Sequence, residues 1–127
     1  MKRIARNIQF SLALVTCLLT QTLSQAESPE SIAEKIRKEY SGGNKDKALK
    51  LAAEGIKKYS EDYSLLTIRG RIYEEEKQHA KAENDYTNVI SKNETDAGIY
   101  HRRGVVRFFQ LKFTDSLADF DRFIEMV

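Results

Sequence analysis

Apolar residues recur along this chain at helical spacing, in stretches that short polar turns separate. Ile32, Ile36 and Tyr40, for example, fall on one face of a helix, because positions three and four apart are neighbours on a helical surface. Gly42 and Gly43 follow and supply the backbone freedom for a tight turn. The same alternation predicts six amphipathic helices, at residues 29–40, 45–59, 63–77, 79–92, 96–111 and 114–127. The sequence therefore predicts an all-α protein.

Two of these helices begin with residues that favour a first turn. Ser28 is a candidate N-cap, and Pro29 fits the first helical position, where a missing backbone amide does no harm. Thr114 is the candidate N-cap of the last helix.

The pattern of residues 63–90 returns at residues 97–124. The matching positions are Leu66 and Tyr100, Arg69 and Arg103, Gly70 and Gly104, Ala82 and Ser116, Tyr86 and Phe120, and Ile90 and Ile124. Their constant separation, which we call the repeat length, is about 34 residues and in a helical sequence predicts an array of stacked helix pairs. Gly70 lies in the middle of a predicted helix, where glycine costs about 1 kcal/mol relative to alanine. We expect the close approach of a neighbouring helix backbone to offset that cost.

These residues resemble the tetratricopeptide repeat, a helix-turn-helix with the same repeat length. The best matches are Leu66, Gly70, Tyr73, Ala82, Tyr86 and Val89, followed by Tyr100, Gly104, Ser116, Phe120 and Phe123. Residues 29–62 depart furthest, with Ile36 in place of the glycine and Ala52 in place of the aromatic residue. The resemblance implies an α-solenoid of three units: a degenerate unit at 29–62, a second at 63–96 and a third at 97–127. About three stacked units is the usual minimum for stability.

Residues 1–26 have the three zones of a secretory signal peptide. A basic head with Lys2 and Arg3 precedes an apolar stretch at 8–19, and cleavage is expected after Ala26. A transmembrane anchor would need roughly 20 continuous apolar residues, more than the stretch at 8–19 offers. Lipid attachment at Cys17 is the third alternative, but Thr16 is a poor fit for the position just before the modified cysteine. We therefore expect an exported protein, periplasmic or secreted, with no membrane association after cleavage.

The charge of the expected mature chain argues against nucleic acid as a partner. Residues 1–26 hold three of the 21 basic residues and none of the 19 acidic ones, so 18 basic and 19 acidic side chains remain. A nucleic-acid-binding surface needs a concentrated basic patch. The only cysteine, Cys17, lies in the expected signal peptide, so the mature chain is expected to contain no disulfide.

We find no catalytic, cofactor-binding or metal-binding pattern in the sequence. Gly42 and Gly43 lack the spacing of a phosphate-binding loop. His79 and His101 have no ligand-type partner at helical spacing, and His79 is expected in a solvated turn between helices. The run Glu74-Glu75-Glu76 is expected to be a solvated helix end. The sequence thus predicts a protein that is not an enzyme and needs no cofactor.

The resemblance implies that the first helix of each unit lines a concave groove that holds a protein or peptide partner. The positions that correspond to groove-facing ones are Ala33, Arg37, Tyr40, Thr67, Arg71, Glu74, His101, Val105 and Phe108. Arg37 and Arg71 are one repeat length apart and would stack in one column, so we expect them to contact an acidic partner segment, with Tyr40 and Phe108 giving apolar contact. The alternative is that the arginines only pair with nearby glutamates on a solvated face. The Lys/Asn clamp of some family members is not present.

The last predicted helix leaves a second hypothesis open. Leu117, Ile124, Met126 and Val127 are expected to form an apolar edge, which solenoids normally cover. A second copy or another protein would fill it, which would make the chain a small self-associating structural subunit. The other explanation is a truncated gene product.

Asn93-Glu94-Thr95 has the form of an N-glycosylation site.

Overall fold

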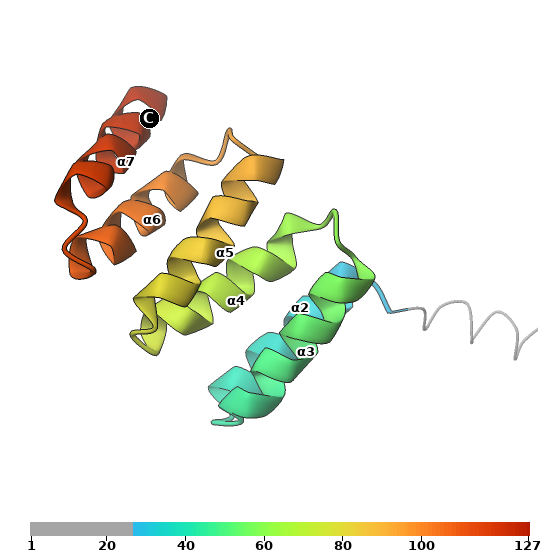
Figure 1. Cartoon of the computed structure of the whole chain (residues 1–127). Coiled ribbons are helices and arrows are strands. Elements are labelled where there is room, and N and C mark those ends of the chain that lie inside the picture. The colour runs from blue at the N-terminus through green and yellow to red at the C-terminus, as the bar shows by residue number, and fades with distance from the viewer. Residues whose placement is uncertain (1–26) are drawn as a thin grey trace, which may run out of the picture.

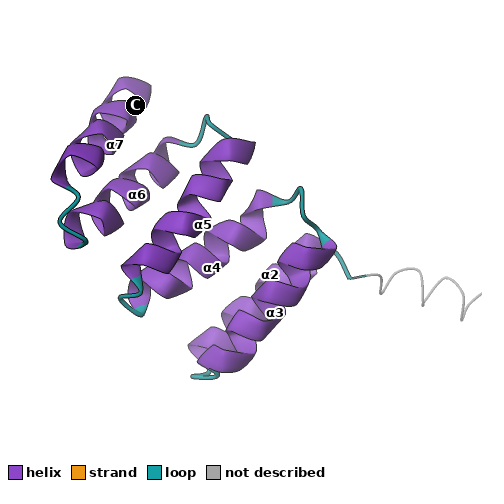
Figure 2. Cartoon of the chain, viewed as in Figure 1, coloured by secondary structure: helices purple, strands orange, loops and turns teal. Residues whose placement is uncertain are grey.

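The computed structural model describes residues 27–127, and this part of the chain is helical, without strands (Figure 2). Its helices are α2 (Pro29–Ser41), α3 (Lys45–Lys58), α4 (Tyr63–Glu75), α5 (His79–Lys92), α6 (Ala97–Phe109) and α7 (Phe113–Met126). They form three helix-turn-helix pairs that stack side by side (Figure 1). We call α2 with α3 unit 1, α4 with α5 unit 2, and α6 with α7 unit 3. Each helix lies within two residues of its predicted bounds.

Side-chain caps begin the first helix of each unit. Ser28 accepts a hydrogen bond from the backbone amide of Ser31 on its hydroxyl oxygen, at 3.2 Å, which confirms it as the N-cap of α2. Asp62 and Asp96, again one repeat length apart, each accept one from the backbone amide two residues further along, at 2.8 and 3.0 Å. The repeat therefore extends to the residues that start its helices.

The second helices begin without such caps, and the prediction for Thr114 was wrong. The helix α7 begins at Phe113, so Thr114 lies inside its first turn, and the N-cap residue Lys112 makes no side-chain cap bond. The reason is the tight turn within each unit, which sets the start of the second helix through its backbone. The residue at the centre of this turn has a positive φ in all three units: Gly43 (85°), Lys77 (57°) and Leu111 (62°).

Two apolar clusters hold the units together. The first joins units 1 and 2 and consists of Ile32, Ala33, Ile36, Ala48, Ala52, Leu65 and Ile72. The second joins units 2 and 3 and consists of Leu66, Ala82, Tyr86, Val89, Ile99 and Val106. Since burying one large aliphatic side chain contributes about 1.5–3 kcal/mol, these clusters are the main source of stability in the array.

An aromatic ring lies over the helix glycine in units 2 and 3. A Cβ added to Gly70 would lie 2.8 Å from Cε1 of Tyr86, and one added to Gly104 would lie 2.8 Å from Cε1 of Phe120. Close approach does explain these glycines, but the expected neighbour was wrong, because a ring of the second helix fills the space rather than a helix backbone. A helix side chain at either position would displace the ring.

The edge formed by α7 is apolar and open in this structure. Leu117, Ile124 and Val127 are 60%, 64% and 78% exposed, whereas Met126 is half-buried.

None of the helices between residues 27 and 127 is long and apolar enough to cross a membrane. The expected signal peptide, with Cys17 and the cleavage position Ala26, lies outside the described residues.

Candidate functional site

The first helices of the three units share one face of the array. α2 packs against α4, and a guanidinium nitrogen of Arg102 in α6 donates to a carboxylate oxygen of Glu74 in α4 at 3.1 Å. The groove positions named from the sequence all lie on these three helices.

Two of the arginines of this face meet in one hollow between α2 and α4. The hollow has a volume of about 120 Å³ and is lined by Arg37, Tyr40, Ile68, Arg71, Ile72 and Glu75. We call it the arginine hollow. Arg37 makes a long, exposed contact of 3.4 Å with Glu34, and Arg71 is exposed and makes no ion pair or side-chain hydrogen bond with any residue in the range 27–127. Both guanidinium groups are therefore available to a ligand.

Tyr40 forms a fixed wall of the arginine hollow. Its hydroxyl donates to Oε1 of Glu76 at 3.2 Å. Burial, together with the neighbouring carboxylates of Glu75 and Glu76, raises the pKa of Tyr40 to about 12, so the hydroxyl stays a donor at physiological pH. Lys45 pairs with the same Glu76 at 3.0 Å and lowers its pKa. The phenol is thus held from one side while its ring lines the hollow.

A second hollow lies beside the first along the same two helices. It has a volume of about 390 Å³ and is lined by Glu30, Ala33, Arg37, Glu61, Asp62, Tyr63 and Ser64. We call it the acidic hollow. Arg37 lines both hollows, so they meet at its side chain.

The other groove positions lie on the same face but not in these hollows. Thr67 donates its hydroxyl to the backbone oxygen of Tyr63 at 3.0 Å. Glu74 accepts hydrogen bonds from Tyr86 and Arg102, so its charge is engaged within the protein. The expectation of a solvated helix end was wrong for Glu74 and Glu76, which are both half-buried; in this run only Glu75 is exposed.

Unit 3 makes its part of the face apolar. Val105 is half-buried, and Phe108 is 52% exposed and packs edge-on against Phe113, with ring centroids 5.6 Å apart. His101 lies against two rings of α7, those of Phe120 and Phe123, at 5.7 and 5.1 Å. The face therefore changes from charged at units 1 and 2 to apolar at unit 3.

Comparison with solved structures shows which family of repeat proteins the three helix pairs resemble. The first TPR domain of Spaghetti (RPAP3) bound to the HSP90 peptide SRMEEVD is 28% identical over 77% of this chain and 78% of its own, with a TM-score of 0.71. The chain is a tetratricopeptide-repeat (TPR) protein. The Arabidopsis OM64 TPR domain has the same fold at 24% identity, with a TM-score of 0.70 over 77% of this chain and 81% of that one. No protein-family model and no curated protein sequence matches the chain.

The TPR units carry buried ion pairs that sequence reasoning missed. Arg69 binds Asp85 through two hydrogen bonds of 2.8 and 2.7 Å, and Arg103 binds Asp119 likewise at 2.9 and 2.7 Å. Both carboxylates are almost fully buried. Arg69 and Arg103 are one repeat length apart in the sequence, and so are Asp85 and Asp119. This shared spacing could have predicted that each arginine pairs with an aspartate of its own unit.

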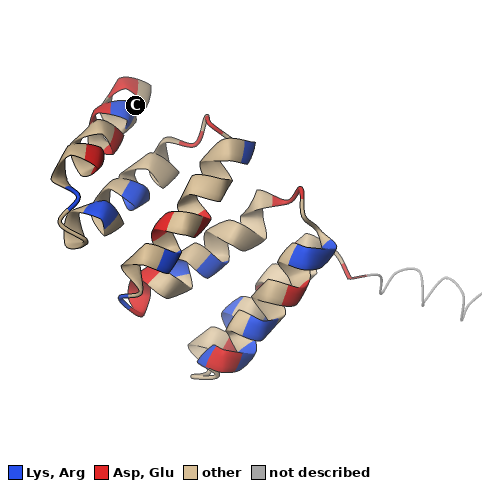
Figure 3. Cartoon of the chain, in the orientation of Figure 1, with Lys and Arg blue, Asp and Glu red and all other residues tan. Residues whose placement is uncertain are grey.

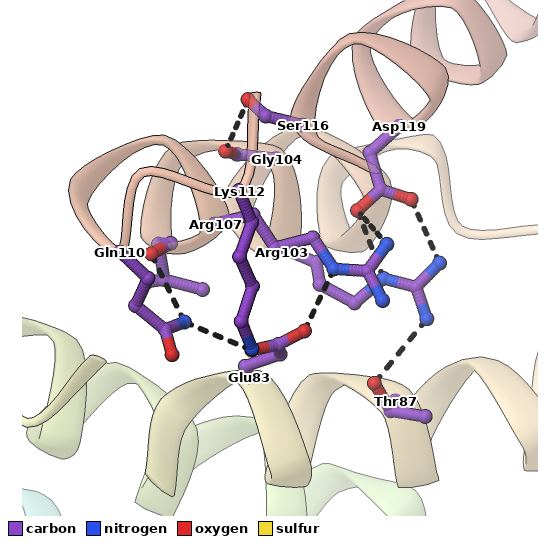
Figure 4. Close-up of polar contacts among 10 residues, drawn as sticks. Glu83, Thr87, Arg103, Gly104, Arg107, Gln110, Lys112, Ser116 and Asp119 are labelled. Atoms are coloured by element: carbon purple, nitrogen blue, oxygen red, sulfur yellow. Dashed lines mark hydrogen bonds and ion pairs between the residues drawn. The ribbon is translucent and has the colours of Figure 1, made fainter. Parts of the chain in front are cut away.

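A polar network extends the second pair to the joint between units 2 and 3 (Figure 4). Arg107 donates to Asp119 at 2.9 Å and to Glu83 of α5 at 2.8 Å. Glu83 also accepts from Gln110 at 2.9 Å and Lys112 at 2.6 Å. Burial acts to raise the pKa of Glu83, but these hydrogen bonds prevail and lower the pKa to about 2. The network ties a carboxylate of unit 2 to the turn of unit 3.

The two histidines of this TPR protein lie apart from the network. The expectation of a solvated turn was wrong for His79, which is the first residue of α5 and stacks on Phe109 with ring centroids 5.0 Å apart. Its Nδ1 is buried without a hydrogen-bond partner in this structure.

No group of three or more possible ligand residues is placed to hold a metal ion within residues 27–127. Figure 3 shows that charged residues of both signs occur on all three helix pairs.

Proposed function

We propose that this TPR protein is an exported, non-catalytic scaffold that holds a protein or peptide segment in the concave groove of α2, α4 and α6. The observation that carries the proposal is the pair of available guanidinium groups in the arginine hollow. Four other arginines, at positions 69, 102, 103 and 107, are engaged by carboxylates of other helices at 3.1 Å or less. Arg37 and Arg71 lack such partners, although guanidinium groups bind carboxylates strongly.

The rest of the groove supplies the apolar contacts that peptide recognition needs. Tyr40 and Phe108 present aromatic rings on the groove helices α2 and α6, and aromatic side chains are frequent anchors of binding energy. A neighbour of 28% identity is bound to a peptide that contains two adjacent glutamates, which supports an acidic segment as the ligand class.

The test is peptide binding by the mature chain and by matched arginine variants. Peptides selected on wild-type protein from a random library would be titrated against Arg37→Gln/Arg71→Gln and against Arg122→Gln. Arg122 is a suitable control because its ion pair, with Glu125 three residues along its helix, is likewise exposed and long at 3.3 Å. We expect binding to weaken about tenfold or more in the double variant only. Equal binding by all three proteins would remove the groove proposal.

The export part of the proposal has its own test. Mass spectrometry of the protein recovered from the periplasm or medium should show a mature chain that begins at Glu27. A chain that keeps residues 1–26 and stays in the cell would contradict export.

A second candidate function is self-association through the open edge of α7. The observation that favours it is the exposure of Leu117, Ile124 and Val127 on one edge of the array, since exposed apolar patches mark interaction sites. Light scattering over a range of concentrations would show a dimer that weakens when Ile124 and Met126 are replaced by polar residues. A monomer at all concentrations would remove this candidate.

A further inference from the structure

We propose that the groove between α2 and α4 recognises an acidic and a basic side chain of the same partner segment, spaced three or four residues apart. The inference rests on the proposed peptide-binding function and adds the charge pattern of the ligand. It follows from the two hollows, which have opposite charge and meet at Arg37.

The arginine hollow favours an anionic side chain. Two guanidinium groups and one carboxylate, that of Glu75, line it. Its remaining lining is apolar, with Ile68, Ile72 and the ring of Tyr40. A volume of about 120 Å³ suits a single side chain whose apolar stem lies on this floor while its carboxylate meets the arginines.

The acidic hollow favours a cationic side chain. Its carboxylates are those of Glu30, Glu61 and Asp62. Asp62 is engaged because it caps α4. Glu61 is 92% exposed and makes a long contact of 3.6 Å with Lys92, and Glu30 makes no ion pair within residues 27–127. Glu30 is thus free, and Glu61 is held only by a long, exposed ion pair, so both can meet a lysine or arginine of a ligand.

The helix geometry gives the spacing between the two ligand charges. Glu30 and Arg37 are seven residues apart on α2, which is roughly 10 Å along the helix axis. Tyr40, on the far side of the arginine hollow, is three residues further. An extended peptide advances about 3.3 Å per residue, so three or four residues span the distance between the hollows.

The charge order also argues against a uniformly anionic ligand. A polyanion that reached Arg37 and Arg71 would place its next charges beside Glu30 and Glu61, and like charges in close contact disfavour binding. A segment with both charges satisfies both hollows. The groove therefore discriminates by repulsion as well as by attraction.

A peptide array tests the spacing directly. Each peptide carries one Glu and one Lys, separated by zero to six residues in both orders, in a background of Ala, Leu and Ser, and the array includes a series with Glu only. We expect the strongest binding at separations of two or three intervening residues, and binding about tenfold tighter than for the matched peptides with Glu alone. The best peptides would then be titrated in solution by fluorescence anisotropy.

Two sets of variants separate this inference from the proposed function. Glu30→Gln/Glu61→Gln should remove the preference for the Lys-containing peptides while keeping the binding of those with Glu only. Arg37→Gln/Arg71→Gln should weaken both kinds of peptide. The pair Arg122→Gln/Glu125→Gln, on α7, is the matched control and should change neither. Circular dichroism would confirm that all variants stay helical.

The outcomes are distinct. If peptides with Glu alone bind as tightly as the mixed ones, or if Glu30→Gln/Glu61→Gln leaves the preference unchanged, the charge-pattern inference is overturned while the groove function stands. If Arg37→Gln/Arg71→Gln binds every peptide like the wild type, the groove function itself fails. Wild-type binding of every array peptide no tighter than that of a peptide without charges would also overturn the inference.

Discussion

The joint between units 1 and 2 and the joint between units 2 and 3 use different chemistry to hold neighbouring helix pairs together. The first is apolar in its centre, where Ala48 and Ala52 of α3 meet Leu65 and Ile72 of α4. Side-chain hydrogen bonds cross it at the rim, where Tyr40 and Lys45 both reach Glu76. The second also has apolar residues but adds the network of Glu83, Arg107 and Asp119.

The difference follows from the positions that are one repeat length apart. Asp85 and Asp119 correspond to Leu51 in unit 1, and Arg69 and Arg103 correspond to Lys35. Unit 1 therefore cannot form the buried ion pair, and its small Ala52 stands where Tyr86 and Phe120 lie over glycines. Ile36 occupies the position of Gly70 and Gly104, so in unit 1 the large side chain comes from the first helix and the small one from the second, and both are buried in the apolar cluster.

The comparison shows what each joint depends on. Apolar contacts are non-directional and tolerate small shifts, whereas an ion pair removed from water is stable only with well-placed partners. The first joint should thus be sensitive to lost volume and the second to lost charge and to pH. The arginine hollow lies at the first joint, where Arg37 and Arg71 are not engaged by carboxylates of other helices.

The largest expected effect comes from breaking the network at Asp119. Replacing Asp119 by Ala leaves the guanidinium group of Arg103 without its carboxylate and takes one of two carboxylates from Arg107, and both arginines are less than one-fifth exposed. Removing one partner of a buried ion pair destabilises by about 3–5 kcal/mol. Urea unfolding followed by circular dichroism would measure this loss.

The matched control for this change is Asp121→Ala, two residues further along α7 and exposed. It should alter the free energy of unfolding by less than about 0.5 kcal/mol. A similar effect of both substitutions would contradict the distinction between a buried and a solvated aspartate.

The second prediction concerns the helix glycines. Gly70→Ala places a Cβ 2.8 Å from the ring of Tyr86, which is buried and held by a hydrogen bond to Glu74. We expect a net destabilisation of about 2 kcal/mol, because overpacking outweighs the gain in helix propensity. In unit 1, a Cβ on Gly55 would lie 3.0 Å from Cγ2 of Ile32 and from Cδ1 of Leu65, which are aliphatic methyl groups rather than a ring held by a hydrogen bond. Gly55→Ala should therefore destabilise less than Gly70→Ala, and equal losses at both glycines would contradict this.

The third prediction uses pH to separate the joints. The pKa of Glu83 is lowered in the folded state to about 2, below its unfolded value of about 4.3. Its ionised form therefore stabilises the fold above the unfolded pKa, and this stabilisation is lost as the pH falls towards 2. After solvent screening we expect a loss of about 1 kcal/mol from this group, measured as urea unfolding between pH 5 and pH 2.5.

Glu83→Gln should flatten this part of the pH dependence, because the amide does not titrate. Glu76→Gln, at the rim of the first joint, is the control and should leave most of it in place. If the two variants show the same pH profile, the second joint has no special dependence on ionisation.

The sequence was sufficient for the helices and the repeat but not for the polar interior. Apolar spacing and the repeat period place six helices within two residues, because both follow from which faces are buried. Asp85 and Asp119 occupy helix positions that look solvated, since a single aspartate carries no mark of burial; its partner lies 16 residues away on another helix. If the repeat length is applied to the polar residues as well, it matches Asp85 with Asp119 in the same way as it matches Arg69 with Arg103.

Of the two hollows between α2 and α4, only the arginine hollow could be predicted from the sequence. The spacing of Arg37 and Arg71 by one repeat length placed them in one column, and the structure brings both into the arginine hollow. Glu61 and Asp62 of the acidic hollow lie between helices. Helical periodicity does not predict where the side chains of a loop between two helices lie, so the acidic hollow could be found only in the structure.

The smallest expected effect is a gain in stability at the turn of unit 3. Leu111 has a φ of 62° and is 73% exposed, whereas the equivalent residue of unit 1 is Gly43. A side chain at positive φ costs about 1–2 kcal/mol, and glycine loses more entropy on folding, by about 0.5–1 kcal/mol. Leu111→Gly should therefore raise the free energy of unfolding by about 0.5 kcal/mol. Gly43→Ala should lower it by a similar amount, and opposite signs of the two changes in thermal unfolding would show that the turn conformation, not the buried joint, decides stability at this position. A loss of stability in both variants would contradict this account.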